Sequence, residues 1–307
     1  MRSAEVEWQV AGSHRHKLVG MSSPAPFDPS RRNLQRYERD IHSFKSVEDF
    51  LGSKPKAGII EIEGPQPLEM LYVPTGGRTT VVTFHPELSK AATPLPLFHG
   101  RKLTSDNNVN KIFVSDPGLY AGDDVRAAWF SGTAKLPLQK ILPEILSKLI
   151  GSAGGERTLF WGQSAGGFAA LFYSRFFPDS LAIPINPQTN LAKFGYLNQR
   201  RYTRAAFGAA TSQEHDAVFA QAICSDLRVH YGGKLENYVL YVQNSIDTHF
   251  DNHMTPFTES LKTTKRLRTV LSSDWGVGHR HPPAEETRNL ISSMTDPEVD
   301  WRTYFLD

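Results

Sequence analysis

One short segment restricts the fold of this chain more than any other: Gly162-Gln163-Ser164-Ala165-Gly166. It follows an apolar run typical of a strand, RTLFWG (157–162), and it opens an apolar run typical of a helix, AGGFAALFYSRFF (165–177). So tight a passage from strand to helix requires glycines where the backbones approach, and it leaves the serine exposed at the tip of the turn. The segment therefore predicts a nucleophilic Ser164. The alternative is a glycine-rich turn in which the serine is incidental.

Apolar runs on both sides of this unit predict the rest of a sheet. Runs rich in Ile, Val, Tyr and Thr, bounded by Pro or Gly, predict strands at 58–64, 68–74, 79–86, 111–118, 181–186, 236–244 and 267–273. Helical spacing predicts further helices over 137–152 and 288–294. Because helical stretches separate many of these strands, we expect an α/β fold with a central, mostly parallel sheet flanked by helices.

The composition and the hydrophobic pattern change near residue 57, which suggests that the chain has two parts. Residues 1–56 are polar and rich in turn formers, which predicts an N-terminal extension, whereas residues 57–307 carry the strand and helix pattern of one domain. The less regular, partly helical stretch at about 190–235 lies between two late strands. We therefore expect it to form a helical cap over the domain.

Composition excludes several classes of function. The 34 basic and 32 acidic residues leave a formal net charge of +2, which does not indicate a nucleic-acid partner. The single Cys224 cannot form an internal disulfide, and the first residues lack the apolar stretch of a signal peptide. No run approaches the roughly 18 to 20 apolar residues of a membrane-spanning helix. We expect a cytoplasmic protein without a transmembrane segment; the composition leaves its oligomeric state open.

A serine hydroxyl needs a base to accept its proton and a third group to orient that base. The segment NSIDTHFDNH (244–253), just past a predicted strand, supplies Asp247 and Asp251 as candidate acids. Enzymes with a serine at a strand-to-helix turn carry the acid before the histidine in the chain. We predict Asp247 as the acid because it lies nearer the end of the strand, and Asp251 remains the alternative.

The segment DWGVGHRHPP (274–283), past the last predicted strand, supplies the candidate base. His279 follows Gly276 and Gly278, which give its loop the freedom to bring the imidazole over the serine. His281 precedes two prolines and is expected to shape the loop or line its rim. We therefore predict His279 as the base.

An anionic intermediate would need hydrogen-bond donors beside the serine. We expect one from the N–H of Ala165 and a second from the loop His85-Pro86-Glu87, where Pro86 has no N–H, so that His85 or Glu87 must donate. We take His85 as the candidate. Further neighbours or pocket residues are expected at Gln163, His281, His249 and Trp129.

No motif for a metal, a nucleotide or another cofactor stands out. His249 and His253 lie four residues apart beside Asp247, which resembles the spacing of metal ligands. They are more simply explained as polar residues around the predicted acid. We therefore predict no metal and no cofactor.

The segments WGQSAGGFAAL, INPQTNL, QNSIDTHF and DWGVGHRHPP together resemble the α/β-hydrolases, and this resemblance runs from about Gly58 to the C-terminus. More narrowly they are similar to hydrolase-like proteins of bacterial surface-polysaccharide loci, namely the capsular XcbB/CpsF-type proteins and the glycan O-acetyltransferases of accessory secretion. The resemblance implies Ser164, Asp247 and His279 as nucleophile, acid and base. It also implies an acyl-ester substrate on a glycan or destined for one.

Three functions follow as hypotheses. The first is a serine esterase that acts on a small-molecule or glycan acyl ester through an acyl-enzyme. The second keeps the acyl-enzyme but passes the acyl group to a sugar hydroxyl, as a glycan O-acyltransferase of surface-polysaccharide biosynthesis. The third is a non-catalytic module that binds a glycan or a protein partner. The presence of Ser164, Asp247 and His279 in the required chain order favours the first two.

Overall fold

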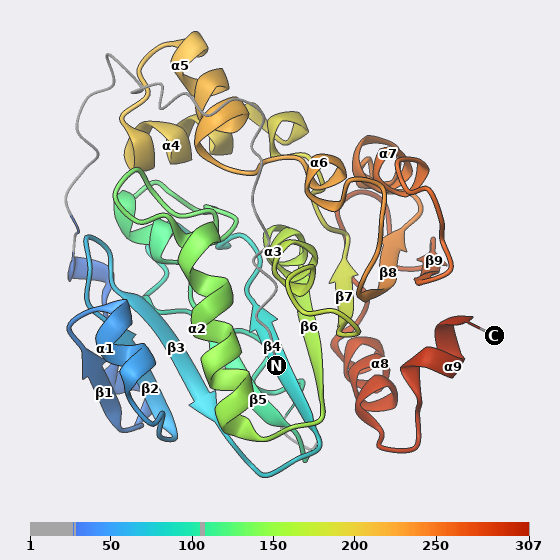
Figure 1. Cartoon of the computed structure of the whole chain (residues 1–307). Coiled ribbons are helices and arrows are strands. Elements are labelled where there is room, and N and C mark those ends of the chain that lie inside the picture. Colours follow the sequence, from blue (N-terminus) through green and yellow to red (C-terminus); the bar gives the residue numbers. More distant parts are fainter. Residues whose placement is uncertain (1–26, 28, 105–107, 307) are drawn as a thin grey trace.

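A single nine-stranded sheet organises the computed structural model, which describes residues 27, 29–104 and 108–306. Its order is β1-β2-β3-β5-β4-β6-β7-β8-β9 (Figure 1). The strands are β1 (Ile41–Phe44), β2 (Gly58–Ile62), β3 (Leu68–Val73), β4 (Thr79–Phe84), β5 (Asn110–Val114), β6 (Arg157–Gln163), β7 (Leu181–Ile185), β8 (Tyr238–Asn244) and β9 (Leu267–Ser272). Only β3 runs antiparallel to its neighbours within the described sheet. The predicted mostly parallel sheet is confirmed.

Helices cover both faces of this sheet. They are α1 (Val47–Gly52), α2 (Leu138–Ala153), α3 (Ala165–Ser174), α4 (Tyr196–Phe207), α5 (Ser212–Ala217), α6 (Leu227–Tyr231), α7 (Thr255–Glu259), α8 (Ala284–Thr295) and α9 (Trp301–Leu306). Strand β6 has apolar side chains on both faces of the sheet. Phe160 packs on one face, in the core with α2 and α3, whereas Leu159 and Trp161 pack on the other face, in a second core with α8 and α9. A parallel sheet that is buried on both faces requires such apolar runs instead of an alternating pattern.

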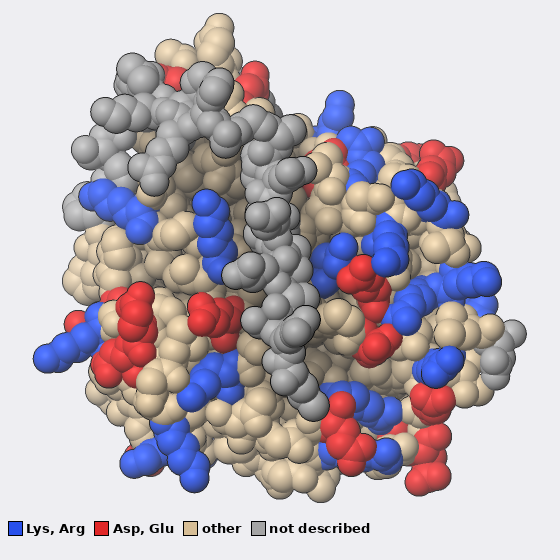
Figure 2. All heavy atoms as spheres, viewed as in Figure 1, with Lys and Arg blue, Asp and Glu red and all other residues tan. Residues whose placement is uncertain are grey.

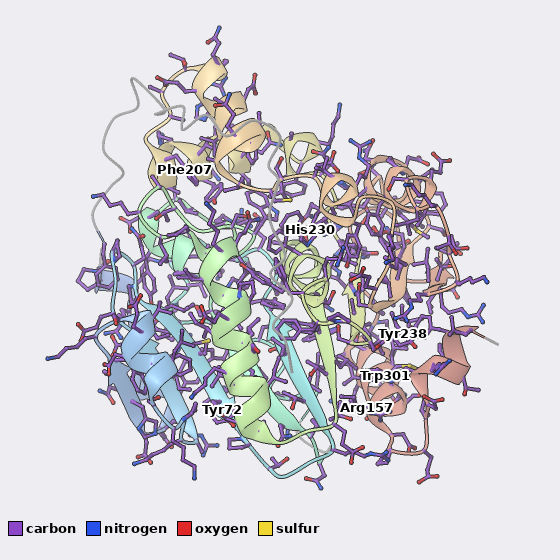
Figure 3. All side chains as sticks on the ribbon, viewed as in Figure 1. Tyr72, Arg157, Phe207, His230, Tyr238 and Trp301 are labelled. Carbon is purple, nitrogen blue, oxygen red and sulfur yellow. The ribbon has the colours of Figure 1, made fainter. Side chains whose placement is uncertain are left out.

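Side chains at the start of β6 hold the C-terminal helices against the sheet. The Arg157 guanidinium lies 4.8 Å from the centre of the Trp301 ring and donates hydrogen bonds to the carbonyls of Val299 and Asp296 (Figure 3). Tyr238, at the start of β8, packs its ring 5.1 Å from that of Phe305. These contacts hold α9 and the segment that follows α8 against the amino ends of the strands.

The segment predicted as an N-terminal extension contributes to the sheet. Its residues 41–44 form β1, which pairs in parallel with β2. The sequence did not predict a strand at residues 41–44. Arg32 donates hydrogen bonds to Glu61 and to the buried Glu69, at 2.5 Å and 2.7 Å. Burial raises the pKa of Glu69, and its hydrogen bonds with Tyr120 and Arg32 oppose that rise. Arg32, in the segment predicted as an extension, therefore links that segment to β2 and β3.

The strands β4, β6, β7, β8 and β9 all end at the same edge of the sheet, as parallel strands must. The connection from β7 to β8 contains α4, α5 and α6, which lie above these carboxyl ends (Figure 1). This connection includes the stretch predicted as a cap. In open α/β sheets, ligands bind at this edge.

Acidic and basic side chains of the described residues are interspersed over the face of the molecule seen in Figure 2. In the described ranges, no helix has both the length and the apolar character needed to cross a lipid bilayer.

Candidate active site

Ser164 occupies a strained turn between β6 and α3. Its φ of 52° lies in the left-handed region, which a residue with a side chain adopts only when its surroundings enforce it. A Cβ on Gly162 would lie 2.1 Å from the carbonyl oxygen of Gly166, and a Cβ on Gly166 would lie 2.3 Å from that of Phe84. Both glycines are therefore required by the close approach of β4, β6 and α3.

The turn brings Ser164 to two residues that are distant in the sequence. His279 Nε2 lies 2.9 Å from Ser164 Oγ, and His279 Nδ1 donates to Asp247 Oδ2 at 2.6 Å. Asp251 is exposed on the turn that follows His249, whereas the Asp247 side chain is almost fully buried. Of the two candidate acids, Asp247 is the one that contacts His279. A serine, a base and an orienting carboxylate in this order can form and resolve an acyl-enzyme.

Asp247 remains charged although it is buried. Burial acts to raise the pKa of its carboxyl group, but hydrogen bonds from His249 and His279 outweigh this effect and hold the pKa well below its ordinary value. The backbone N–H of His249 adds a further hydrogen bond at 3.0 Å. A carboxylate that accepts several hydrogen bonds stays ionised. It can therefore fix the tautomer of His279 and stabilise the ring when that ring accepts a proton.

A second histidine uses the same carboxylate. His249 Nδ1 lies 3.0 Å from Asp247 Oδ1, and the His249 ring stacks on that of His279 with their centres 4.2 Å apart. Gln188 then links His249 to the serine, because its Nε2 lies 2.9 Å from His249 Nε2 and 2.9 Å from Ser164 Oγ. Burial lowers the pKa of His249, and its hydrogen bond to Asp247 opposes that effect. His249 is therefore a neutral neighbour of the predicted acid.

Ser164 is less accessible than the sequence suggested. The turn predicts an exposed hydroxyl, yet the residue is only 5% exposed. Gln188 and His279 both contact its Oγ, and the turn itself is packed between β4 and β7. Solvent reaches this group of residues from the side of His279, whose side chain is 32% exposed.

Two asparagines shape the loop that carries His279. Asn244, at the end of β8, donates from Nδ2 to the carbonyls of Gly276 and Gly278 at 2.8 Å and 3.1 Å. Asn186 donates to the carbonyl of Arg280 at 2.7 Å. Its Nδ2 also lies 3.3 Å from Nδ1 of His281, whose pKa burial lowers to about 4. His281 thus contacts Asn186 beneath this loop, and a loop-shaping role for it remains a prediction.

The surroundings of the predicted oxyanion donors differ on the two sides of the serine. The N–H of Ala165 is the first of α3, where the helix itself offers no acceptor. Both ring nitrogens of His85 are engaged by backbone groups: Nδ1 donates to the Pro86 carbonyl at 2.8 Å, and Nε2 accepts from the N–H of Asp116, just past β5, at 3.1 Å. Any donation from His85 must therefore come from its backbone, and its role as an oxyanion donor remains a prediction.

The remaining candidates fall into two groups. Trp129 donates from its indole nitrogen to Gln188 Oε1 at 3.2 Å, so it contacts the serine through Gln188. Gln163 lies beside the partly buried side chain of His99, whose pKa burial lowers. Potential metal-binding atoms of Asp247, His249 and His279 lie within 4.8 Å of one another. A metal there would have to replace both histidine hydrogen bonds to the carboxylate, so the residues suit a proton relay better.

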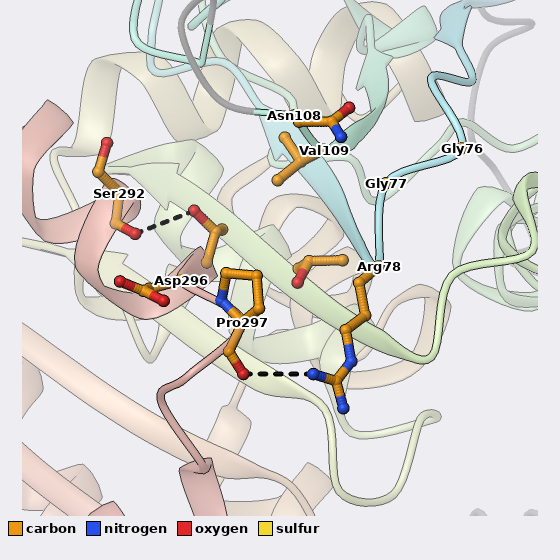
Figure 4. A pocket seen from close by; sticks show the side chains of 10 residues that line it. Gly76, Gly77, Arg78, Asn108, Val109, Ser292, Asp296 and Pro297 are labelled. Carbon is orange, nitrogen blue, oxygen red and sulfur yellow. Dashed lines mark hydrogen bonds between the residues drawn. The ribbon is translucent and has the colours of Figure 1, made fainter.

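A pocket at the opposite edge of the sheet is a separate feature. It lies between the start of β4, the residues before β5 and the end of α8 (Figure 4). Arg78 donates across it to the Pro297 carbonyl at 3.3 Å. The pocket lies at the amino ends of the strands and takes no part in the Ser164 arrangement.

Comparison with solved structures places the fold. The capsule O-acetyltransferase of Neisseria meningitidis serogroup A matches 80% of this chain and 96% of its own, with a TM-score of 0.56 and 18% identity. A mutant of that protein in complex with CoA gives a TM-score of 0.57 at 16% identity, over 80% of this chain and 97% of its own. Dipeptidyl peptidase 4 of Porphyromonas gingivalis matches 84% of this chain and 35% of its own, with a TM-score of 0.52 and 13% identity.

The chain has the α/β-hydrolase fold. The predicted resemblance is thereby confirmed at the level of fold. The Gap123 glycosylation-associated complex of Streptococcus agalactiae is also similar, with a TM-score of 0.55 and 15% identity, over 76% of this chain but only 45% of that chain. No protein-family model matches the sequence, and a search of curated proteins finds no match.

The sequence analysis did not single out Gln188, Asn244 or Asp116 for the site. Each is a buried polar residue just past the end of a strand at the carboxyl edge of the sheet, or at that end. That position was the available signal, because ligands of α/β folds bind at this edge. What the sequence could not give is which of these polar residues turn toward Ser164.

Proposed function

We propose that this chain catalyses acyl transfer from an ester through an acyl-enzyme on Ser164. The observation that carries the proposal is the continuous contact from Ser164 Oγ through His279 to Asp247, at 2.9 Å and 2.6 Å. The α/β-hydrolase fold supports it, because this is a fold of esterases and acyltransferases.

The steps follow from these contacts. His279 Nε2 accepts the hydroxyl proton as Ser164 Oγ bonds to the carbonyl carbon, and Asp247 stabilises the protonated ring. We assign the Ala165 N–H, with a backbone donor at His85, to the oxyanion. The bond from the carbonyl carbon to the leaving atom then breaks, and that atom, the oxygen of an ester or the sulfur of a thioester, takes the proton from His279. An incoming hydroxyl then gives its proton to His279 as its oxygen attacks the carbonyl carbon of the acyl-enzyme. The bond between that carbon and Ser164 Oγ breaks, and Oγ takes the proton back from His279.

The acceptor distinguishes the two enzymatic candidates. An esterase uses water, whereas an O-acyltransferase uses a sugar hydroxyl of a surface polysaccharide. The similarity to a capsule O-acetyltransferase over most of both chains favours transfer to a glycan. CoA in one of those structures makes acetyl-CoA the first acyl donor to test.

The test of the proposal is covalent labelling of the purified protein with a fluorophosphonate, read by intact mass. We expect one adduct on the wild type, none on Ser164→Ala, and a loss of acyl-ester turnover of about 10³-fold or more in that variant. Ser212→Ala, which removes an exposed hydroxyl on α5, is the matched control and should label like the wild type. A correctly folded wild type that gains no adduct would favour a non-catalytic binding module.

The acceptor requires a second measurement. Acetyl-CoA and an activated acetyl ester are each incubated with and without a panel of sugars, and the products are identified by mass. An acetylated sugar that forms only with intact Ser164 supports the transferase. Release of acetate alone, at a rate unchanged by any sugar, supports the esterase.

A further inference from the structure

Gln188 is the buried polar residue that lies closest to the chemistry without an assigned role. It follows β7, the strand next to the one that carries Ser164, and it has no exposed surface. Its Nε2 lies 2.9 Å from Ser164 Oγ, the same separation as that between His279 and the serine. Gln188 therefore touches the reacting oxygen directly.

The orientation of the Gln188 amide is determined by its neighbours. The indole N–H of Trp129 can only donate, so the atom of Gln188 that faces it at 3.2 Å must be the carbonyl oxygen. The NH₂ group then faces the other way and has two hydrogens to give. One points to Ser164 Oγ and the other to His249 Nε2.

The rest of the network agrees with this direction. His249 Nε2 must accept, so the ring hydrogen lies on Nδ1, where it donates to Asp247. Ser164 Oγ accepts from Gln188, so its own hydrogen is free to point to His279 Nε2. Every hydrogen bond from Trp129 to Asp247 thus has one donor and one acceptor, without conflict.

Trp129 itself is held at a cost in backbone strain. Trp129 and Phe130 are consecutive bulky residues with φ of 50° and 55°. Asp116 accepts from the N–H of Phe130 at 2.7 Å, and the Tyr173 hydroxyl donates to the Phe130 carbonyl at 2.6 Å. Strain of this kind persists only where surrounding contacts enforce it, and it gathers at functional sites. Here the strained turn delivers one indole N–H to Gln188.

We propose that Gln188 is a further catalytic residue, whose amide N–H, oriented by Trp129, directs the Ser164 proton to His279 and stabilises the negative charge that develops on Oγ. The inference rests on the proposed acyl transfer. The proton passes from Oγ to His279 Nε2 and the Oγ electron pair forms the bond to the carbonyl carbon. Gln188 gives up no proton; its N–H remains a donor throughout.

The experiment measures the second-order rate constant of fluorophosphonate labelling for Gln188→Met, Gln188→Glu and Trp129→Phe. Gln188→Met keeps the approximate shape of the side chain but donates nothing, and we expect a fall of about 10- to 100-fold. Trp129→Phe removes the group that fixes the amide, and a smaller fall of about three- to tenfold is expected. Gln139→Met is the matched control, because Gln139 also bonds through both ends of its amide, to Cys224 and at 3.4 Å to Ser131, but these hydrogen bonds include neither Ser164 nor Gln188.

Gln188→Glu gives a readout that a purely structural role would not produce. An ionised carboxylate would accept the Ser164 proton and draw it away from His279, whereas the protonated acid can donate to Oγ. His249 faces this position directly, Asp247 and His279 lie beyond, and His253 contacts the next residue, Thr189. We therefore expect the ratio of variant to wild-type labelling rates to rise as the pH falls, with thermal stability recorded at each pH.

The outcomes separate the two proposals. If the wild type is not labelled, the acyl-transfer proposal fails, and with it this one. If the wild type is labelled and Gln188→Met is labelled as fast as Gln139→Met, only the role of Gln188 is overturned. A pH-independent ratio for Gln188→Glu also overturns it. If Gln188→Met does not fold, Trp129→Phe and Gln188→Glu decide between these results.

Discussion

The two histidines on Asp247 have the same chemical partner and opposite surroundings. His279 lies on a glycine-containing loop with 32% of its side chain exposed, whereas His249 lies on the turn after β8 with 9% exposed. Both direct Nδ1 to the carboxylate. The difference teaches that a contact with the acid does not make a histidine the base, because a base must also reach the serine proton and the substrate.

The two rings also differ in the hydrogen-bond partner of Nε2. His279 Nε2 contacts Ser164 itself, while His249 Nε2 is occupied by the Gln188 amide. A ring that exchanges a proton with the serine must reach the serine hydroxyl, and of these two rings His279 is the one that does. His249 instead gives Asp247 a second hydrogen bond, which helps to keep that carboxylate ionised.

The largest expected effect concerns His279, the more exposed of the two histidines. His279→Ala removes the proposed base, and the turnover of an acyl ester should fall by about 10³-fold or more. Added imidazole should restore part of the activity, since the side chain lies at the surface and leaves an accessible space. His42→Ala, on β1 at the far edge of the sheet, is the control and should leave turnover unchanged. Equal losses in His279→Ala and His249→Ala, both rescued by imidazole, would break the comparison.

A buried histidine remote from the site shows what burial does alone. His230 on α6 stacks on Phe172 (His230 is labelled in Figure 3), and burial lowers its pKa to about 4. The folded state thus stays neutral there while the unfolded chain gains a proton below its ordinary pKa of about 6.5, so the free energy of unfolding falls as the pH drops through this window.

His230→Gln keeps an N–H that can donate to the Phe172 carbonyl but does not titrate. Between about pH 7 and about pH 5, urea unfolding should show the wild type losing about 2 kcal/mol more stability than the variant. Parallel losses in the two proteins would mean that His230 does not remain neutral in the folded state.

The smallest expected effect concerns His249, the buried histidine. His249→Gln removes the ring, but Asp247 keeps His279 and the backbone N–H of residue 249. We expect turnover to fall by about tenfold, the scale of one lost hydrogen bond, and imidazole to restore none of it because the space is buried. Rescue by imidazole in this variant would assign His249 a direct part in proton transfer.

Much of the site could be predicted because its parts are fixed by local chemistry. The turn at Ser164 is too tight for a Cβ at the flanking positions, so glycines are required there. This requirement can be recognised because the residues involved are neighbours in the sequence. Asp247 and His279 each lie in the first turn or loop after a strand, where parallel strands deliver their polar residues to one edge. The strands followed from apolar runs, with the exception of β1, whose residues Ile41–Phe44 carry no clear strand pattern.

What only the tertiary structure decided is how these residues meet. The sequence by itself determined a mostly parallel sheet, the serine at its strand-to-helix turn, and two later loops with an acid and histidines. It did not determine that Asp247 rather than Asp251 contacts His279, that His249 shares the carboxylate, or that Trp129 orients Gln188 on the serine. Side-chain direction at the end of a strand depends on the packing of distant segments, so only the folded chain selects which polar groups converge on Ser164.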